Sequence, residues 1–160
     1  MAELATQVAD FGHYLTVEQG LAANSVTSYT QELRNLGTYL AQQHLTSFKD
    51  ADRLTIMAYL SNLTATGKSR NSVIHAVSAL RKFYRYLVQT HQMTTNPMAN
   101  VAAPKHAEHL PAVLTVAEVD RLLAAPDTTT KYGLRDRAIL EVMYATGLRV
   151  SELVHLKLAD

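Results

Sequence analysis

Apolar residues recur every three or four positions through the first ninety residues, and this spacing constrains the fold more than any other feature of the chain. Such spacing places apolar side chains on one face of an α-helix. It predicts four helices, over residues 3–19, 25–40, 51–63 and 69–90. Asn24 is a favoured N-cap residue, so we expect the second helix to begin directly after it. The expected fold class is all-α, beginning with a four-helix domain.

The segment after the fourth predicted helix is rich in proline. Pro97, Pro104 and Pro111 fall within residues 92–113. Proline lacks the backbone N–H that a helix needs, and it disfavours helical geometry in the residue before it. We therefore expect residues 1–91 to form one domain and residues 92–113 to form a linker.

A second domain is predicted to begin after this linker. Thr115 and Glu118 stand at the spacing of a capping box, which opens a helix that should end near residue 125. A further helix should cover residues 134–144 and end before Gly147, and a short turn of helix should follow. Residues 114–160 are too few to enclose a complete core, so we expect them to be the truncated start of a domain.

The composition indicates a globular, cytoplasmic protein. Hydrophobic residues make up 48% of the chain and the mean hydropathy is −0.06, a balance that allows a real core. No apolar run approaches the ~20 residues of a membrane-spanning helix. The acidic N-terminus lacks the form of a secretory signal. The absence of cysteine excludes disulfides and thiolate metal sites.

The net charge of +1 hides a strong asymmetry along the chain. Residues 53–107 contain seven Lys or Arg residues and no Asp or Glu, whereas residues 1–52 contain two basic and six acidic residues. A basic stretch without acids is typical of a surface that binds a polyanion such as nucleic acid. The alternative interpretation is a solvated helix face that happens to be basic.

The fourth predicted helix is the best candidate for contact with DNA. A helix fits the major groove, where polar side chains reach base edges and basic ones hold phosphates. Its polar side includes His75, and the positive end of its dipole lies near its first residues. The candidate DNA-binding residues are Thr27, Gln31, Arg34, Lys68, Arg70, Asn71, Ser78, Arg81, Lys82, Arg85 and Lys105.

One further motif, Tyr144 to Leu153, points to phosphate chemistry. Gly147 would end one helix and Arg149 would open the next, which holds a permanently charged, planar guanidinium at a backbone corner. Glu152 would orient it, although an Arg–Glu pair at this spacing is more often a surface salt bridge. The seven histidines are scattered without an HExxH pattern, and no glycine-rich phosphate loop occurs. We expect no metal and no cofactor.

These landmarks together resemble the tyrosine recombinases of the Xer type, the bacterial relatives of phage integrases. The resemblance covers essentially the whole chain and favours the XerD-like subtype, on Pro126 and Leu134-Arg-Asp-Arg, with XerC-like recombinases and phage or transposon integrases left open. Its landmarks, in the order of the family, are Ala23-Asn-Ser-Val-Thr-Ser-Tyr29, Leu80-Arg-Lys-Phe-Tyr-Arg-Tyr-Leu87, Asn96-Pro97 leading to Pro104-Lys105, and Leu110-Pro111 continuing to Ala145-Thr-Gly-Leu-Arg-Val-Ser-Glu-Leu153.

The resemblance implies a SAM-like, four-helix core-binding domain and a catalytic domain that together clamp DNA. In such enzymes a tyrosine attacks the scissile phosphate and forms a 3′-phosphotyrosyl intermediate without metal, and arginines stabilise the transition state. By motif match, Arg149 is the first catalytic arginine and Glu152 its supporting acid. None of the eight tyrosines of this chain matches the nucleophile. We therefore expect a chain that binds DNA but does not cleave it by itself.

The same resemblance implies the partners and the process. They are a double-stranded DNA recombination site and, for the full-length protein, a second recombinase subunit within a tetramer on two DNA sites. The process is chromosome dimer resolution or DNA integration, and the isolated chain is expected to be monomeric. Two alternatives are a non-catalytic DNA-binding regulator and a helical protein-interaction module.

Overall fold

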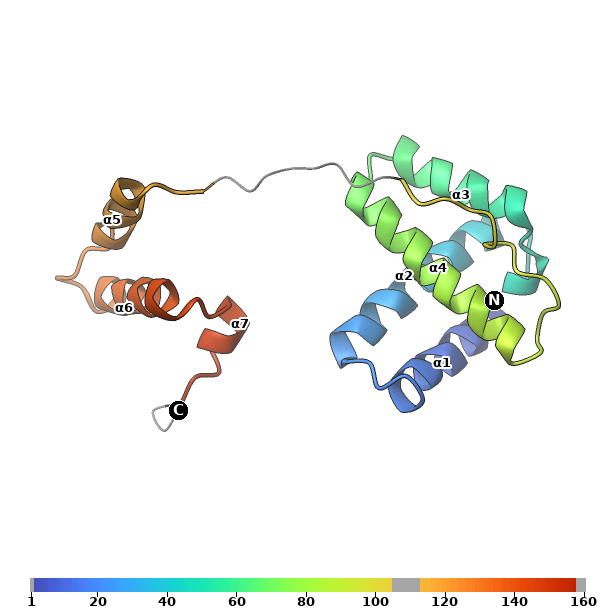
Figure 1. Ribbon diagram of the computed structural model, residues 1–160, viewed down its shortest axis with the longest axis horizontal. Coiled ribbons are helices and arrows are strands. Elements are labelled where there is room, and N and C mark those ends of the chain that lie inside the picture. The colour runs from blue at the N-terminus through green and yellow to red at the C-terminus, as the bar shows by residue number, and fades with distance from the viewer. Residues whose placement is uncertain (1, 105–112, 158–160) are drawn as a thin grey trace. The chain divides into compact units, whose positions relative to one another are not determined.

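The computed structural model describes residues 2–104 and 113–157, and the chain divides into two compact units, Met1–Glu108 and His109–Asp160 (Figure 1). Every regular element in the described residues is a helix, so the predicted all-α fold class is confirmed. None of the described helices is long and apolar enough to cross a lipid bilayer.

The first unit contains the four helices that the apolar spacing predicts, and a short 3₁₀ helix in addition. Helix α1 packs against α2, and α4 packs against both α2 and α3 (Figure 1). The observed ends lie within three residues of the predicted ones. The bounds are α1 Ala2–Val17, α2 Ala23–Gln42, η1 Phe48–Asp50, α3 Arg53–Ala65 and α4 Arg70–Gln89.

The start of α2 differs from the prediction. Its N-cap is Ala22, whose side chain makes no capping hydrogen bond, and Asn24 lies inside the first turn. The Leu21 backbone N–H donates to the Leu15 carbonyl at 3.0 Å, and the Ala22 carbonyl accepts from the Ser25 N–H at 2.9 Å. The short connection from α1 therefore fixes where α2 begins, and the capping preference of Asn24 does not decide it.

The start of α3 also differs, because the chain forms η1 just before it. Ala51 is buried at 2% exposure in extended backbone. The helix begins only after Asp52, whose carboxylate accepts from the Thr55 backbone N–H at 2.8 Å. The Asp52–Thr55 cap explains why α3 starts at Arg53 instead of the predicted residue 51.

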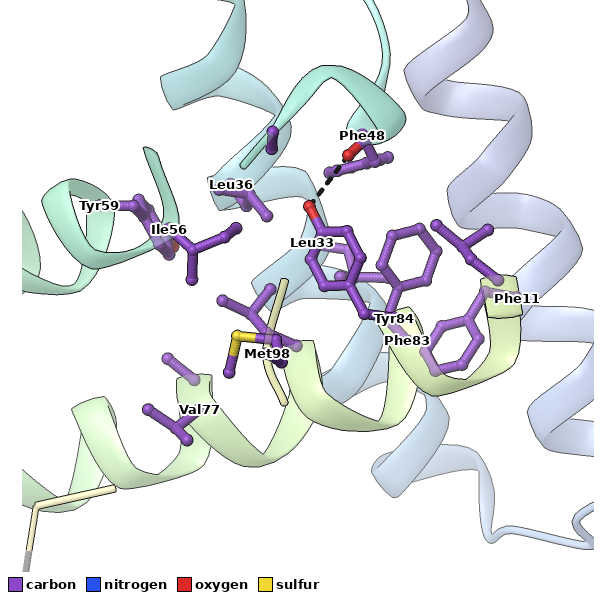
Figure 2. Packing of buried hydrophobic residues seen from close by; sticks show 14 of the residues in the cluster. Phe11, Leu33, Leu36, Phe48, Ile56, Tyr59, Val77, Phe83, Tyr84 and Met98 are labelled. Carbon is purple, nitrogen blue, oxygen red and sulfur yellow. Dashed lines mark hydrogen bonds between the residues drawn. The ribbon is translucent and has the colours of Figure 1, made fainter. Parts of the chain in front are cut away.

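Aromatic side chains from α1, η1 and α4 fill the centre of the first unit (Figure 2). The Phe83 ring lies 5.2 Å from the Phe11 ring and 4.9 Å from the Phe48 ring, in edge-to-face arrangements that aromatic rings favour. The fully buried Tyr84 donates from its hydroxyl to the Phe48 carbonyl at 3.1 Å. One face of α4 thus supplies the middle of the core, and the opposite face of the helix is not needed for packing.

Part of the predicted linker packs on this same core. Met98 is 1% exposed and lies in the buried cluster (Figure 2). Val101 is 7% exposed and belongs to the same cluster. The Asn96 side-chain oxygen accepts from the Met98 backbone N–H at 2.8 Å and shapes the turn. The Arg81 guanidinium donates to the Val101 carbonyl at 2.9 Å. Residues 96–101 are therefore attached to the first unit.

The second unit consists of α5 Val116–Ala124, α6 Lys131–Thr146 and α7 Val150–Leu153. The predicted capping box is confirmed, since Thr115 and Glu118 exchange hydrogen bonds at 2.8 and 3.3 Å. Helix α6 begins three residues before the predicted residue 134, because the Thr130 hydroxyl accepts from the Gly133 backbone N–H at 3.0 Å. Gly147 ends α6 with a φ of 70°, as the sequence predicts.

The second unit buries little apolar surface within its described residues. Gly133 is its only buried residue there. A unit with this many exposed apolar side chains contrasts with the closed core of the first unit. Those that are more than half exposed are Val113, Leu114, Val116, Tyr132, Leu134, Tyr144, Val150 and Val154.

Candidate nucleic-acid interface

A polar groove lies between the N-terminal halves of α2 and α4, on the side of both helices that faces away from the aromatic core. The groove has a volume of about 510 Å³, and most of the residues that line it carry an amide or hydroxyl group. A neighbouring hollow of about 450 Å³ shares Asn24, Ser28 and His75 with it. The groove is lined by Asn24, Thr27, Ser28, Gln31, Glu32, Asn35, Leu63, Lys68, Ser72 and His75.

One hydrogen bond joins the two helices across this groove. The Ser28 hydroxyl on α2 lies 2.7 Å from the His75 Nε2 atom on α4. The His75 ring also meets the edge of the Tyr29 ring, with centroids 5.6 Å apart. These contacts fix the spacing of α2 and α4 outside the core, so the groove keeps a defined width.

The structure brings several of the predicted DNA-binding residues to this place. Thr27, Gln31 and Lys68 line the groove, and Ser78 lines the neighbouring hollow. Three further predicted residues are exposed on α4. They are Arg70 and Asn71 in its first turn and Arg85 near its end.

Two further predicted cations, Lys82 and Arg34, lie outside the groove. Lys82 is half-buried, and its ammonium group donates to the Gln19 side chain at 3.4 Å. Arg34 borders a separate hollow between α1 and α2, and its guanidinium donates to the Gln31 side chain at 3.5 Å. Both cations thus lie on the first unit beside the groove residues and not within the groove.

Two of the predicted residues stand apart from the rest. The Arg81 guanidinium is committed to the Val101 carbonyl, so it holds the segment after α4. Spacing within one helix could not show that a segment twenty residues later would reach Arg81. Lys105 lies outside the described residues.

The cations around the groove are available to an external anion. Within residues 2–104, no Lys or Arg side chain forms a salt bridge with a carboxylate; the salt bridges of the described residues all lie in the second unit. A phosphate that binds Lys68, Arg70 or Arg85 would therefore not have to displace a carboxylate of the protein.

Four residues of α2 line the groove without having been expected there from the sequence, namely Asn24, Ser28, Glu32 and Asn35. A signal was present, because residues 24, 28, 31 and 35 repeat at helical spacing on the face of α2 opposite Leu33. Glu32 is held by the Tyr59 hydroxyl, which donates to it at 2.6 Å. Burial, and then the hydrogen bond to Glu32, raises the pKa of Tyr59, which keeps the phenol protonated.

Arg149 and Glu152 have the local geometry that the sequence predicts. Arg149 is the N-cap of α7, two residues after the left-handed Gly147. Glu152 accepts from the Arg149 backbone N–H at 2.7 Å and from its guanidinium at 3.2 Å. The Arg149 side chain is 82% exposed. Its guanidinium is therefore oriented by one carboxylate and is otherwise open to solvent.

Two family models match the chain. The model described as "Phage integrase, N-terminal SAM-like domain" matches residues 8–91, and the model of the phage integrase family matches residues 112–160. The first match begins within α1 and covers α2, α3, α4 and the polar groove. The second covers the unit that contains Arg149.

Curated relatives match over nearly the whole chain. A tyrosine recombinase XerD from Lacticaseibacillus casei is 50% identical over 151 residues, which are 94% of this chain and 51% of the relative. A XerD from Listeria monocytogenes serotype 4b is 41% identical over 154 residues, covering 96% and 52%. A XerC from Herpetosiphon aurantiacus is 39% identical over 155 residues, covering 96% and 51%. The chain thus spans about half the length of these relatives.

A solved structure shares the fold. The integrase from mycobacterium phage Brujita superposes with a TM-score of 0.57 at 22% sequence identity, over 91% of this chain and 46% of the integrase. At this identity the likeness concerns the fold alone.

Proposed function

Because the chain belongs to the phage integrase family, as its sequence motifs predict, we propose that it is the DNA-binding part of a site-specific tyrosine recombinase. In this proposal residues 1–91 form the core-binding domain, residues 92–113 form the linker and residues 114–160 begin the catalytic domain. The full-length enzyme breaks and rejoins DNA through a 3′-phosphotyrosyl intermediate, in chromosome dimer resolution or DNA integration.

The observation that carries the proposal is the polar groove between α2 and α4, together with cations beside it that form no salt bridge. Polar side chains on a helix read base edges, and cations beside it hold phosphates. Both kinds of residue stand on one side of the first unit, since Gln31 and Lys68 line the same groove. Helix α4 buries its other side in the core, so this face can enter a major groove without unfolding the domain.

The proposal divides the candidate residues into two roles. Thr27, Gln31, Asn71 and Ser78 approach bases, and six cations bind phosphates. Arg81 contributes indirectly, by holding the first part of the linker on the first unit. The cations assigned to phosphates are Arg34, Lys68, Arg70, Lys82, Arg85 and Lys105.

In the second unit, we assign Arg149 to the scissile phosphate and Glu152 to its orientation. A planar guanidinium stabilises the charge that builds up on a phosphate in the transition state. The exposed apolar side chains around α5, α6 and α7 support the proposal that these helices need the rest of a catalytic domain to form a working site. We therefore propose that the 160-residue chain binds DNA without cleaving it.

The proposed partners are a double-stranded recombination site and, in the full-length enzyme, a second recombinase subunit in a tetramer on two sites. The 160-residue chain on its own is proposed to be monomeric and cytoplasmic, where chromosomal DNA is accessible. A regulator without catalytic function would share the DNA affinity. A protein-interaction module would have no such affinity, and the titration below distinguishes it from the two DNA-binding functions.

A titration of fluorescein-labelled duplex DNA with the full chain at several salt concentrations tests the proposal. If about four phosphates are contacted, the logarithm of the binding constant should fall with the logarithm of salt with a slope of roughly −3 to −4. Arg85→Ala should make the slope shallower by about one. Lys49→Ala, an exposed cation on η1 outside the groove, should leave it unchanged. A slope near zero, or equal effects of the two substitutions, would refute the proposal.

A further inference from the structure

Four side chains of α2 and one of α3 form a continuous series of hydrogen bonds along the groove. The Tyr59 hydroxyl donates to Glu32 Oε1 at 2.6 Å, and the Asn35 amide donates to Glu32 Oε2 at 3.5 Å. The Gln31 amide donates to Asn35 Oδ1 at 3.2 Å. The Arg34 guanidinium donates to Gln31 Oε1 at 3.5 Å.

The chemistry of the two ends sets the direction of the whole series. The Glu32 carboxylate can only accept hydrogen bonds, and the Arg34 guanidinium can only donate them. The Asn35 amide must therefore turn its nitrogen to Glu32 and its oxygen to Gln31. The Gln31 amide must in turn direct its nitrogen to Asn35 and its oxygen to Arg34. A single orientation of both amides satisfies every link, whereas amide orientations are usually ambiguous.

The inner end of the series is fixed by the core. Tyr59 is 2% exposed, and its ring lies 5.3 Å from the Tyr39 ring. The bond from Tyr59 to Glu32 is short, and the protonated phenol cannot lose its donor role near neutral pH. The exposed amides of Asn35 and Gln31 are thereby connected through Glu32 to the buried Tyr59, even though the hydrogen bonds at 3.5 Å are weak.

Gln31 keeps the hydrogen-bonding groups that one base requires. Its amide uses one N–H on Asn35, which leaves a second N–H and a lone pair on Oε1. Adenine presents an acceptor, N7, and a donor, the N6 amino group, in the major groove, and a glutamine amide matches both. The negative charge of Glu32, in the same groove, repels phosphate and favours a base at this point.

We propose that Tyr59 and Glu32 are positioning residues that fix the Gln31 amide for recognition of an adenine in the major groove. This inference rests on the proposed DNA-binding function and adds a base preference to it. Neither positioning residue touches DNA in the proposal. They act by removing alternative orientations of Gln31, which would otherwise accept several bases.

The test is selection of bound duplexes from a randomised DNA library by the full chain, followed by sequencing. The wild-type chain should prefer adenine at one position by about tenfold, the discrimination typical of one bidentate contact. Gln31→Ala should abolish that preference, and Tyr59→Phe and Glu32→Gln should each weaken it severalfold. Gln43→Ala, which removes an exposed amide at the C-cap of the same helix, should change nothing.

Two readouts separate positioning from a general loss of structure. Glu32→Gln should raise the affinity for DNA of unrelated sequence while it weakens the adenine preference, because it removes a negative charge from the groove. A merely structural role would lower both. Circular dichroism checks folding, and if Tyr59→Phe does not fold, Glu32→Gln carries the test.

The possible failures are distinguishable. If the chain binds DNA with a steep salt dependence but Gln31→Ala keeps the adenine preference, or the folded Tyr59 and Glu32 variants discriminate as well as wild type, this inference is wrong and the proposed function stands. If the wild-type chain shows no salt-dependent binding, both are wrong.

Discussion

Replacing Met98 with alanine should destabilise the first unit by about 3 kcal/mol, although the residue lies beyond the four helices. Met98 is 1% exposed within the core cluster, and truncation of a buried methionine to alanine costs roughly 2–5 kcal/mol through lost contacts and the cavity left behind. Met57 on α3 is 47% exposed, so Met57→Ala should cost less than about 0.5 kcal/mol and serves as the matched control.

The assay is urea denaturation of the full chain, followed by far-ultraviolet circular dichroism. By itself, Arg81→Ala should lower the free energy of unfolding by about 1 kcal/mol. The loss is smaller because the hydrogen bond from Arg81 to the Val101 carbonyl is charge-assisted but only partly shielded from solvent. The Met98 and Arg81 effects should not be additive, since both residues hold the same segment. Equal midpoints for the wild type and Met98→Ala would refute the attachment of residues 96–101 to the core.

Three further substitutions probe the start of α6, the end of α4 and the cap of α3. Gly133→Ala should disorder the start of α6, because a Cβ there would collide with the backbone carbonyl of Asp127. Hydrogen exchange at the backbone amides of the first turn of α6 as slow as in the wild type would contradict this. His91→Gly should stabilise the first unit by about 0.5–1 kcal/mol by relieving a φ of 56°, and a lower denaturation midpoint would count against it. Hydrogen bonds from the Thr55 backbone and hydroxyl hold the pKa of Asp52 below its ordinary value of 3.8. The Asp52 cap should therefore stabilise α3 above pH 3.8, and this stabilisation should be lost as the pH falls through the lowered pKa. An acid denaturation profile of Asp52→Asn identical to that of the wild type would oppose this.

Apolar spacing was enough to predict the four helices and their core. Val73, Val77, Leu80, Tyr84 and Leu87 recur at helical spacing, and all five are buried in α4. The prediction works because burial of one helix face is a local property of the sequence. The capping box at Thr115 was predictable for the same reason, since its two members are three residues apart.

Contacts between distant segments could not be predicted in this way. The bond between Ser28 and His75 joins residues 47 positions apart, and that from Arg81 to Val101 spans 20 positions. Spacing within one helix indicates which side chains share a face, but it carries no information on which other segment will meet that face. The Tyr59–Glu32 contact that orders the groove belongs to the same class.

The start of α2 shows a different limit. Asn24 is the better capping residue, yet the helix begins at Ala23. The connection from α1 is only a few residues long, and its backbone hydrogen bonds place the first turn. Tertiary geometry therefore overrides a capping preference that amounts to about 1 kcal/mol.

If the α2–α4 face of the first unit binds DNA, the amide-resolved nuclear magnetic resonance spectrum of the isotopically labelled full chain should change at that face during titration with duplex DNA. The signals of Thr27, Gln31, Lys68 and Ser78 should shift together, and those of Leu54, on the exposed side of α3, should not. Shifts centred on α3, with the groove residues unchanged, would show that DNA binds elsewhere.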